Sequence, residues 1–131
     1  MKIYIVMEDS SEYYDGSYYP RAAFKNRESA KKYGTVLTQL WGDYLIEECE
    51  IEESDILDDI LWVVYSEEAY SSGVVSFRNA FGKREEAEAY ANKINNDKNH
   101  VYSTYFNARV DDVYIDKDLD NIEAEYNAKY Q

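Results

Sequence analysis

Side chains able to carry out catalysis are scarce in this sequence. It contains one histidine, His100, and one cysteine, Cys49, and no serine lies in a Gly-x-Ser-x-Gly turn. His100 is expected on the surface, where a loop meets a strand, and Cys49 is predicted to point into the core. No glycine-rich phosphate loop occurs, and one cysteine with one histidine cannot form a zinc site. The sequence therefore predicts no enzyme and no cofactor.

One stretch has the spacing of a metal site. The run from Asp116 to Asp120 matches the opening of a calcium-binding loop, but its sixth position is Asn121 instead of glycine. Its twelfth position, Asn127, replaces the bidentate glutamate, so calcium would bind weakly and we predict no metal site. A pair of acids for glycoside hydrolysis stays open, although nothing in the sequence marks two of them as buried.

Acidic residues are the main anomaly, with a formal net charge of −13 over 131 residues. No basic residue occurs between Lys32 and Arg78. Glu48, Glu50 and Glu52 alternate along a predicted strand, so they share one face at a spacing of about 6.6 Å, similar to that of nucleic-acid phosphates. The acids that we expect to contact a partner are Glu47, Glu48, Glu50, Glu52, Glu53, Asp55, Asp58 and Asp59. The alternative is that the acids only keep the protein in solution or reflect a salt-adapted host.

Tyrosine is also in excess, with 15 residues of 131. Tyr13, Tyr14, Tyr18 and Tyr19 lie in and beside the first predicted loop, where they are difficult to bury together. Tyrosines beside carboxylates are typical of protein-binding surfaces, because they provide contact area with little loss of entropy. We expect these four to be anchors for a partner, or else to cover a sheet edge.

The elements that position these residues come from an internal repeat. The stretch from Arg21 to Tyr33 matches the stretch from Arg78 to Tyr90 without a gap, with shared Arg, Ala, Phe, Arg, Glu, Ala and Tyr. The same offset pairs further residues outside these stretches: Ile3 with Ile60, Tyr13 with Tyr70, Gly16 with Gly73, and Leu37 with Ile94.

Each copy is predicted to have the order strand, strand, helix, strand. In the first copy, the strands are expected at residues 2–8, 18–25 and 44–53, and a helix capped by Asn26 should end near Gly42. In the second copy, the strands are expected at residues 60–65, 73–81 and 101–110, and an extension of the last strand to Ile115 stays open. The second helix, residues 84–95, follows Lys83, which is a poor N-cap.

This pattern predicts an α+β fold in which two β-β-α-β modules pack about a pseudo-twofold axis. One three-stranded sheet with one helix cannot bury both of its faces alone, so the copies should share a core. The predicted boundaries are residues 1–54, 59–116 and 117–131. The last segment is a short helix with an apolar stripe of Leu119, Ile122, Tyr126 and Tyr130, expected to pack on the second module or to bind a partner.

The overall composition indicates a cytoplasmic protein. No apolar run approaches the roughly 20 residues that cross a bilayer, and no signal-peptide pattern follows Met1. A lone cysteine suits a reducing compartment. The charge disfavours direct binding to nucleic acid or to anionic lipid and favours a basic protein partner.

In size, acidity, carboxylate rows and exposed tyrosines, the chain resembles the phage-encoded anti-restriction and anti-CRISPR proteins, some of which mimic DNA. This resemblance implies a cytosolic inhibitor that binds the basic DNA- or RNA-binding surface of a host defence nuclease through the acids and tyrosines named above. The alternative is a non-enzymatic interaction module or homodimer that uses the C-terminal stripe, with acidity serving solubility alone.

Overall fold

The computed structural model describes residues 1–9, 18–37, 43–68, 75–96 and 106–130. The elements follow the order predicted from the repeat, with a helix added at the end. They are β1 (Lys2–Asp9), β2 (Tyr18–Phe24), α1 (Arg27–Leu37), β3 (Tyr44–Glu50), a short 3-10 turn (Glu53–Asp55), β4 (Ile60–Glu68), β5 (Val75–Phe81), α2 (Arg84–Asn95), β6 (Phe106–Tyr114) and α3 (Leu119–Tyr130). The predicted α+β class with two β-β-α-β modules is confirmed. No helix in the described part of the chain is long and apolar enough to span a membrane.

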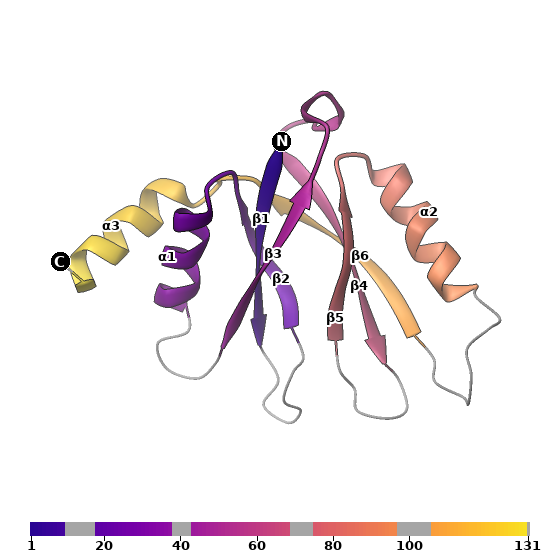
Figure 1. Cartoon of the computed structure of the whole chain (residues 1–131), viewed down its shortest axis with the longest axis horizontal. Coiled ribbons are helices and arrows are strands. Elements are labelled where there is room, and N and C mark those ends of the chain that lie inside the picture. The colour runs from indigo at the N-terminus through magenta and orange to yellow at the C-terminus, as the bar shows by residue number, and fades with distance from the viewer. Residues whose placement is uncertain (10–17, 38–42, 69–74, 97–105, 131) are drawn as a thin grey trace.

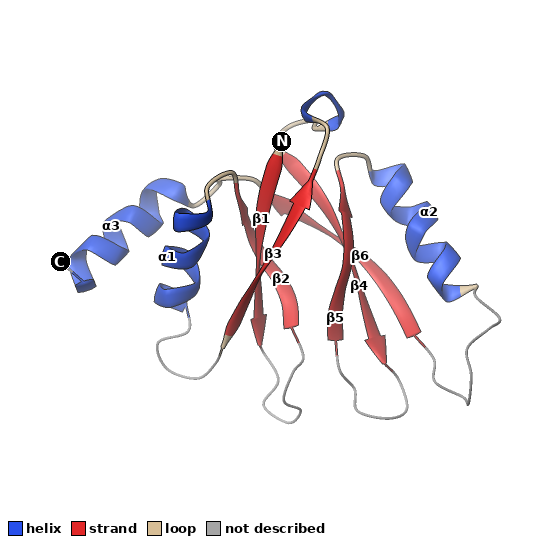
Figure 2. Ribbon diagram, viewed as in Figure 1, coloured by secondary structure: helices blue, strands red, loops and turns tan. Residues whose placement is uncertain are grey.

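The strands form two antiparallel three-stranded sheets with the orders β2-β1-β3 and β5-β4-β6. The sheets face each other, α1 covers the outer face of the first sheet, and α2 covers the outer face of the second (Figure 1). The result is four layers in the order helix, sheet, sheet, helix, with α3 beside α1 (Figure 2). Because β1 and β4 are central strands buried on both faces, their sequences are apolar with almost no alternation.

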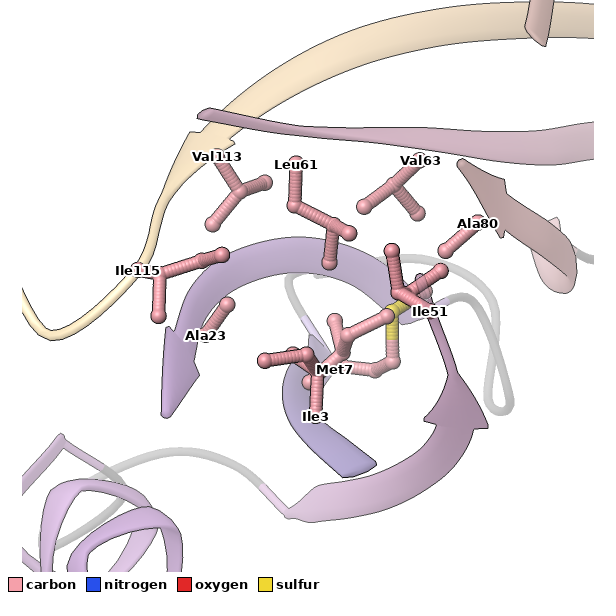
Figure 3. Close-up of a cluster of buried hydrophobic side chains, with 10 residues drawn as sticks. Ile3, Met7, Ala23, Ile51, Leu61, Val63, Ala80, Val113 and Ile115 are labelled. Carbon is pink, nitrogen blue, oxygen red and sulfur yellow. The ribbon is translucent and has the colours of Figure 1, made fainter. Parts of the chain in front are cut away.

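A shared core between the two sheets joins the modules (Figure 3). Ile3, Ile5 and Met7 of β1 meet Leu61 and Val63 of β4, and all five side chains are fully buried. The remaining buried members of this core are Ala23, Ile51, Ala80, Val113 and Ile115. Equivalent residues of the two copies therefore lie together in one core.

The register of the central strands corrects the sequence alignment by one residue. The residue of the second copy that is structurally equivalent to Ile3 is Leu61, which is fully buried. Ile60, which the gapless alignment matches to Ile3, is only half-buried. Ala23 lies opposite Ile5, as Ala80 lies opposite Val63, so β2 and β5 keep the predicted offset. The two copies thus differ by one residue between their first and second strands. The proposed pairs Tyr13–Tyr70 and Gly16–Gly73 lie outside the described residues.

The repeated stretch holds each helix on its sheet. Phe24 and Tyr33 pack with ring centroids 5.5 Å apart at 51°, and Phe81 and Tyr90 repeat this contact at 5.4 Å and 53°. The repeated alanines, Ala30 of α1 and Ala87 of α2, are fully buried where each helix packs on its sheet. Most of the repeated motif is therefore explained by packing.

The helix ends follow the predicted capping. Asn26 Oδ1 accepts hydrogen bonds from the N–H groups of Glu28 (2.8 Å) and Ser29 (3.4 Å), whereas Lys83 makes no side-chain cap. α2 ends at Asn95, as predicted, and the predicted end of the first helix at Gly42 lies outside the described residues.

The position of α3 corrects one prediction. After β6 the chain crosses to the first module, where Asp116 N–H donates to Ala23 O (2.8 Å), and α3 packs along α1. Ile122 is 6% exposed, and Lys32 Nζ contacts Glu123 Oε2 (2.9 Å) and lies 5.4 Å from the Tyr126 ring. Residues 117–130 therefore complete the first module and do not pack on the second.

The two copies fill one helix–sheet contact in different ways. Gly34 of α1 lies against the Tyr44 ring, while the equivalent positions of the second copy hold Ala91 and Ala108. A Cβ added at Gly34 would collide with that ring. Glycine and tyrosine in one copy thus replace two alanines in the other.

We predict that the effect of Gly34→Ala changes sign with residue 44. Alanine gains about 1 kcal/mol in helix propensity, but overpacking against Tyr44 costs about 1–3 kcal/mol. We expect a net loss of stability in the wild-type background and a gain in the Tyr44→Ala background. Urea unfolding of the two single variants and the double variant measures this cycle. If the changes in unfolding free energy of the two single variants added up to that of the double variant, the proposal that Gly34 makes room for the Tyr44 ring would be contradicted.

Candidate functional site

β3 displays the predicted alternation of acids and apolar residues. Cys49 lies opposite Ile3 and packs on the shared core. Glu48 and Glu50 lie on the opposite, outer face of the strand and are exposed. Ile51 follows into the core at 6% exposure. Leu45, opposite Met7 and by alternation on the same face as Cys49, is 43% exposed. The outer face of β3 therefore carries an acidic row.

The chain's own cations partly neutralise this row. Glu48 Oε1 lies 3.3 Å from Lys2 Nζ, and Glu50 Oε1 lies 2.8 Å from the α-amino group of Met1. The hydrogen bond from that amine lowers the pKa of Glu50, and the bond to Glu48 raises the pKa of Lys2. Asp55 Oδ1 is 3.4 Å from Lys83 Nζ. Exposed ion pairs of this kind contribute about 0–1 kcal/mol, so a partner's arginine can replace the internal cation.

Glu47 does not belong to the acidic row. It lies opposite Ile5 and, by alternation, on the same face of the sheet as Cys49, where it is half-buried. Glu47 therefore does not share a face with Glu48 and Glu50, and its contact with a partner stays a prediction. Its equivalent in the second copy is Asp111, opposite Val63.

The segment between the modules presents a group of exposed acids. We call Glu52, Glu53, Asp58 and Asp59 the acidic linker. All four are exposed, and no ion pair engages them within the part of the chain that the structure describes. The linker lies at one end of the two sheets, beside the N-terminus (Figure 1).

A tight turn holds half of the acidic linker in an unusual backbone conformation. Leu57 O accepts a hydrogen bond from Ile60 N–H (3.1 Å), and Asp58 and Asp59 between them have φ values of 55° and 58°. Both central residues are thus left-handed, as in type I′ turns, where Asn-Gly is preferred. Leu57 at the start of the turn is 73% exposed. Sequence analysis missed this leucine, although its position among acids in the linker was a usable signal.

Two of the four tyrosines predicted to be anchors make contacts within the chain. Tyr18 packs against the shared core, and the Tyr19 ring meets the Tyr65 ring edge-on at 5.9 Å. These two are therefore used within the chain, which agrees with the alternative that they cover a sheet edge. Tyr13 and Tyr14 lie outside the described residues.

The remaining candidates for chemistry are Cys49, His100 and the calcium-like run that begins at Asp116. Burial raises the pKa of Cys49 to about 11, so the group is a thiol at neutral pH, and its Sγ donates to Ile3 O at 3.6 Å. His100 lies outside the described residues. The described part of the chain contains no cluster of three acid, histidine or cysteine side chains able to hold a metal. Asp116, first in the calcium-like run, instead accepts a hydrogen bond from Lys25 N–H (3.2 Å).

The C-terminal stripe is also used internally. Leu119 packs against the core beneath α1, Ile122 is buried, and Tyr126 faces Lys32. The side chain of Tyr130 lies outside the described residues. The surface that the alternative hypothesis assigned to a partner is thus largely covered by α1.

No family model, curated protein or solved structure matches this chain. The functional argument therefore depends on the geometry of the described residues.

We predict a loss of stability at alkaline pH that depends on Tyr65. Burial, and then the Asp111 carboxylate, raise the pKa of Tyr65 from 10.0 to about 12. The unfolded chain therefore loses this proton first, and the free energy of unfolding should fall as the pH rises from 10 towards 12. Urea unfolding across this pH range should show a shallower fall for Tyr65→Phe, and an intermediate one for Asp111→Asn. Identical pH profiles would contradict the assignment.

Proposed function

We propose that this protein is a non-enzymatic inhibitor that binds the basic nucleic-acid-binding surface of another protein. The class of target that we propose is a host defence nuclease of the CRISPR or restriction type. The observation that carries the proposal is the acidic linker, whose four exposed carboxylates have no ion-pair partner among the described residues. In a chain of net charge −13, these carboxylates are grouped within eight residues and are exposed to a partner's lysines and arginines.

The overall charge supports a basic target. A field of this sign repels nucleic acid and attracts a groove lined with lysine and arginine, which raises the association rate at low salt. The two exposed acids of β3, Glu48 and Glu50, extend the negative surface because their internal ion pairs are weak and exchangeable.

The backbone geometry of the turn supports the proposal that the carboxylates of Asp58 and Asp59 contact a partner. A left-handed conformation costs a non-glycine residue roughly 1 kcal/mol, and glycine or asparagine would suit Asp58 and Asp59 better. Carboxylates at these two positions are therefore retained against the local backbone preference. Strained residues of this kind concentrate at functional sites.

The scaffold also presents the acids with little loss of entropy on binding. Ile51 N–H donates to Met1 O (2.8 Å) at one end of the linker, and Ile115 N–H donates to Asp59 O (2.7 Å) at the other. Between them, Asp55 lies against Gly82, where an added Cβ would come within 2.9 Å of the Asp55 Cβ. A segment fixed at both ends and in the middle needs little ordering when a partner arrives.

We predict that neutralising the acidic linker weakens inhibition. The variant Glu52→Gln/Glu53→Gln/Asp58→Asn/Asp59→Asn removes four charges. It places asparagine, which tolerates the left-handed conformation, at both central positions of the turn. At about 0.5 kcal/mol per rim charge, four charges correspond to roughly 2 kcal/mol, or about 30-fold in affinity. The measurement is DNA cleavage by purified CRISPR effectors and restriction nucleases, titrated with each variant at low and high salt.

The matched control removes the same number of charges elsewhere. Glu85, Glu86, Asp120 and Glu125 are exposed on α2 and α3, and their Gln or Asn variants give the same net charge. We expect the control to inhibit almost as well as the wild type. Equal weakening by both variants would show that net charge acts without a defined surface. An absence of inhibition across the whole panel would contradict the target class.

A further inference from the structure

The duplication provides an internal control for which surface residues the fold requires. In the first copy, Lys2 lies opposite Glu50 on the outer face, and their side chains are 63% and 68% exposed. The equivalent pair in the second copy is Ile60 opposite Tyr114. Because the same scaffold position accepts two charged residues in one copy, the apolar pair in the other copy is not dictated by the fold.

The second copy carries an apolar surface around this pair. Tyr114 is 43% exposed, Ile60 is half-buried, and neither belongs to the three hydrophobic clusters of the described residues. Trp62 is the next residue of β4 on the same face and is half-buried at the margin of the cluster under α2. Leu57 leads into Ile60 through the tight turn and is 73% exposed. We call Leu57, Ile60, Trp62 and Tyr114 the apolar corner.

A hollow adjoins the apolar corner on the side of the first module. It has a volume of about 220 Å³ and lies between β2 and β6, with Phe24, Val113 and Tyr114 among its lining residues. Arg21 and Asp112 add charged groups to the same lining. Tyr114 therefore stands between an exposed apolar face and a concave site into which a partner's side chain can fit.

Cations cover the aromatic rings of the corner in the free chain. Arg84 lies 5.3 Å from the centroid of the Trp62 ring, and Lys117 lies 5.2 Å from that of Tyr114. Arg84 Nε also contacts Glu88 Oε1 at 2.8 Å, so its charge is already balanced. Contacts of this kind shield exposed rings and, because they are weak at exposed sites, can be exchanged for a partner's side chains.

The rim of the corner is acidic on balance, because three aspartates face Lys117 and Arg84, and Arg84 is already paired with Glu88. Asp58 and Asp59 lie between Leu57 and Ile60, and Asp112 lies opposite Trp62. All three carboxylates are exposed. A partner with acidic residues around its apolar contact would be repelled, whereas lysines or arginines there would be attracted.

We propose that the apolar corner docks a protein segment whose apolar side chains are flanked by lysine or arginine. The sign of the partner's charge rests on the proposed function, and the corner supplies that basic partner with the apolar anchor that the acidic linker lacks. Aromatic and aliphatic residues inside a charged rim are the usual composition of an energetic hot spot. The copy-to-copy difference places this anchor on the second module alone.

The test replaces the apolar pair by the residues of the other copy. Ile60→Lys/Tyr114→Glu reproduces the Lys2/Glu50 pair and leaves the net charge unchanged. The matched control is Leu37→Lys/Leu45→Glu, which removes two other exposed leucines and is also neutral in charge. The probe is a synthetic amphipathic peptide of leucine and lysine, compared with serine–lysine and leucine–glutamate peptides of equal length. Calorimetric titration gives each dissociation constant, and urea unfolding checks that each variant is folded.

We expect the leucine–lysine peptide to bind at least tenfold more tightly than either comparison peptide. Ile60→Lys/Tyr114→Glu should abolish this tenfold preference, and the control should keep it. If the exchange prevents folding, Leu57→Asp, at a position 73% exposed, replaces it and should weaken binding severalfold.

Three results would overturn the inference. Equal binding of the serine–lysine peptide would show that charge alone acts, and the proposed function would survive. Preference for the leucine–glutamate peptide would contradict the expected sign of the partner in both proposals. Concentration-dependent self-association that the Ile60→Lys/Tyr114→Glu exchange abolishes, without binding of the leucine–lysine peptide, would assign the corner to a second copy of the chain.

Discussion

Burial of the inner faces of the two sheets is the constraint on which the rest of the structure depends. A three-stranded sheet has two faces, and a single helix covers only one of them. Each module solves this by packing its second face on its own duplicate, which buries Ile3 and Ile5 against Leu61 and Val63. β1 and β4 are consequently buried on both sides. Any polar or charged function is thereby confined to the edge strands, the helices and the segment that joins the modules.

The same constraint gives many of the repeated residues a packing role. Phe24 with Tyr33, and Phe81 with Tyr90, hold each helix on its sheet with almost the same geometry. The repeated arginine of the second strand keeps its position but changes its partner. Arg21 Nε pairs with Glu8 at 2.7 Å, whereas Arg78 Nε donates to Ser66 Oγ at 2.6 Å. Function is therefore better sought where the copies differ on a common scaffold.

Much of the fold could be predicted from the sequence, because the repeat, the capping residues and the alternation in β3 are local signals. The offset between Ile3 and Leu61 could not, since a change of one residue between the first two strands is invisible to a gapless alignment that matches Ile3 to another isoleucine. The outer face was predicted correctly for Glu48 and Glu50, but their neutralisation depends on Met1 and Lys2, which lie beside them at the start of β1. Pairings over such sequence distances have no local signal, and the docking of α3 on α1 is another case.

The linker both connects the modules and forms an exposed surface, and these two demands favour different residues at the turn. As a connection, it needs only to carry the chain from β3 of the first sheet to β4 of the second, and a glycine-containing turn would do this with less strain. As a surface, it places carboxylates and an exposed leucine at the end of a rigid double sheet. The Asp58-Asp59 turn favours the second role over the first, because it concentrates like charges in a conformation that aspartate adopts at a cost. The shared core makes this tolerable, since the stability gained between the sheets offsets a local strain of a few kcal/mol at most. A duplicated core thus allows the connecting segment to be selected for what it presents.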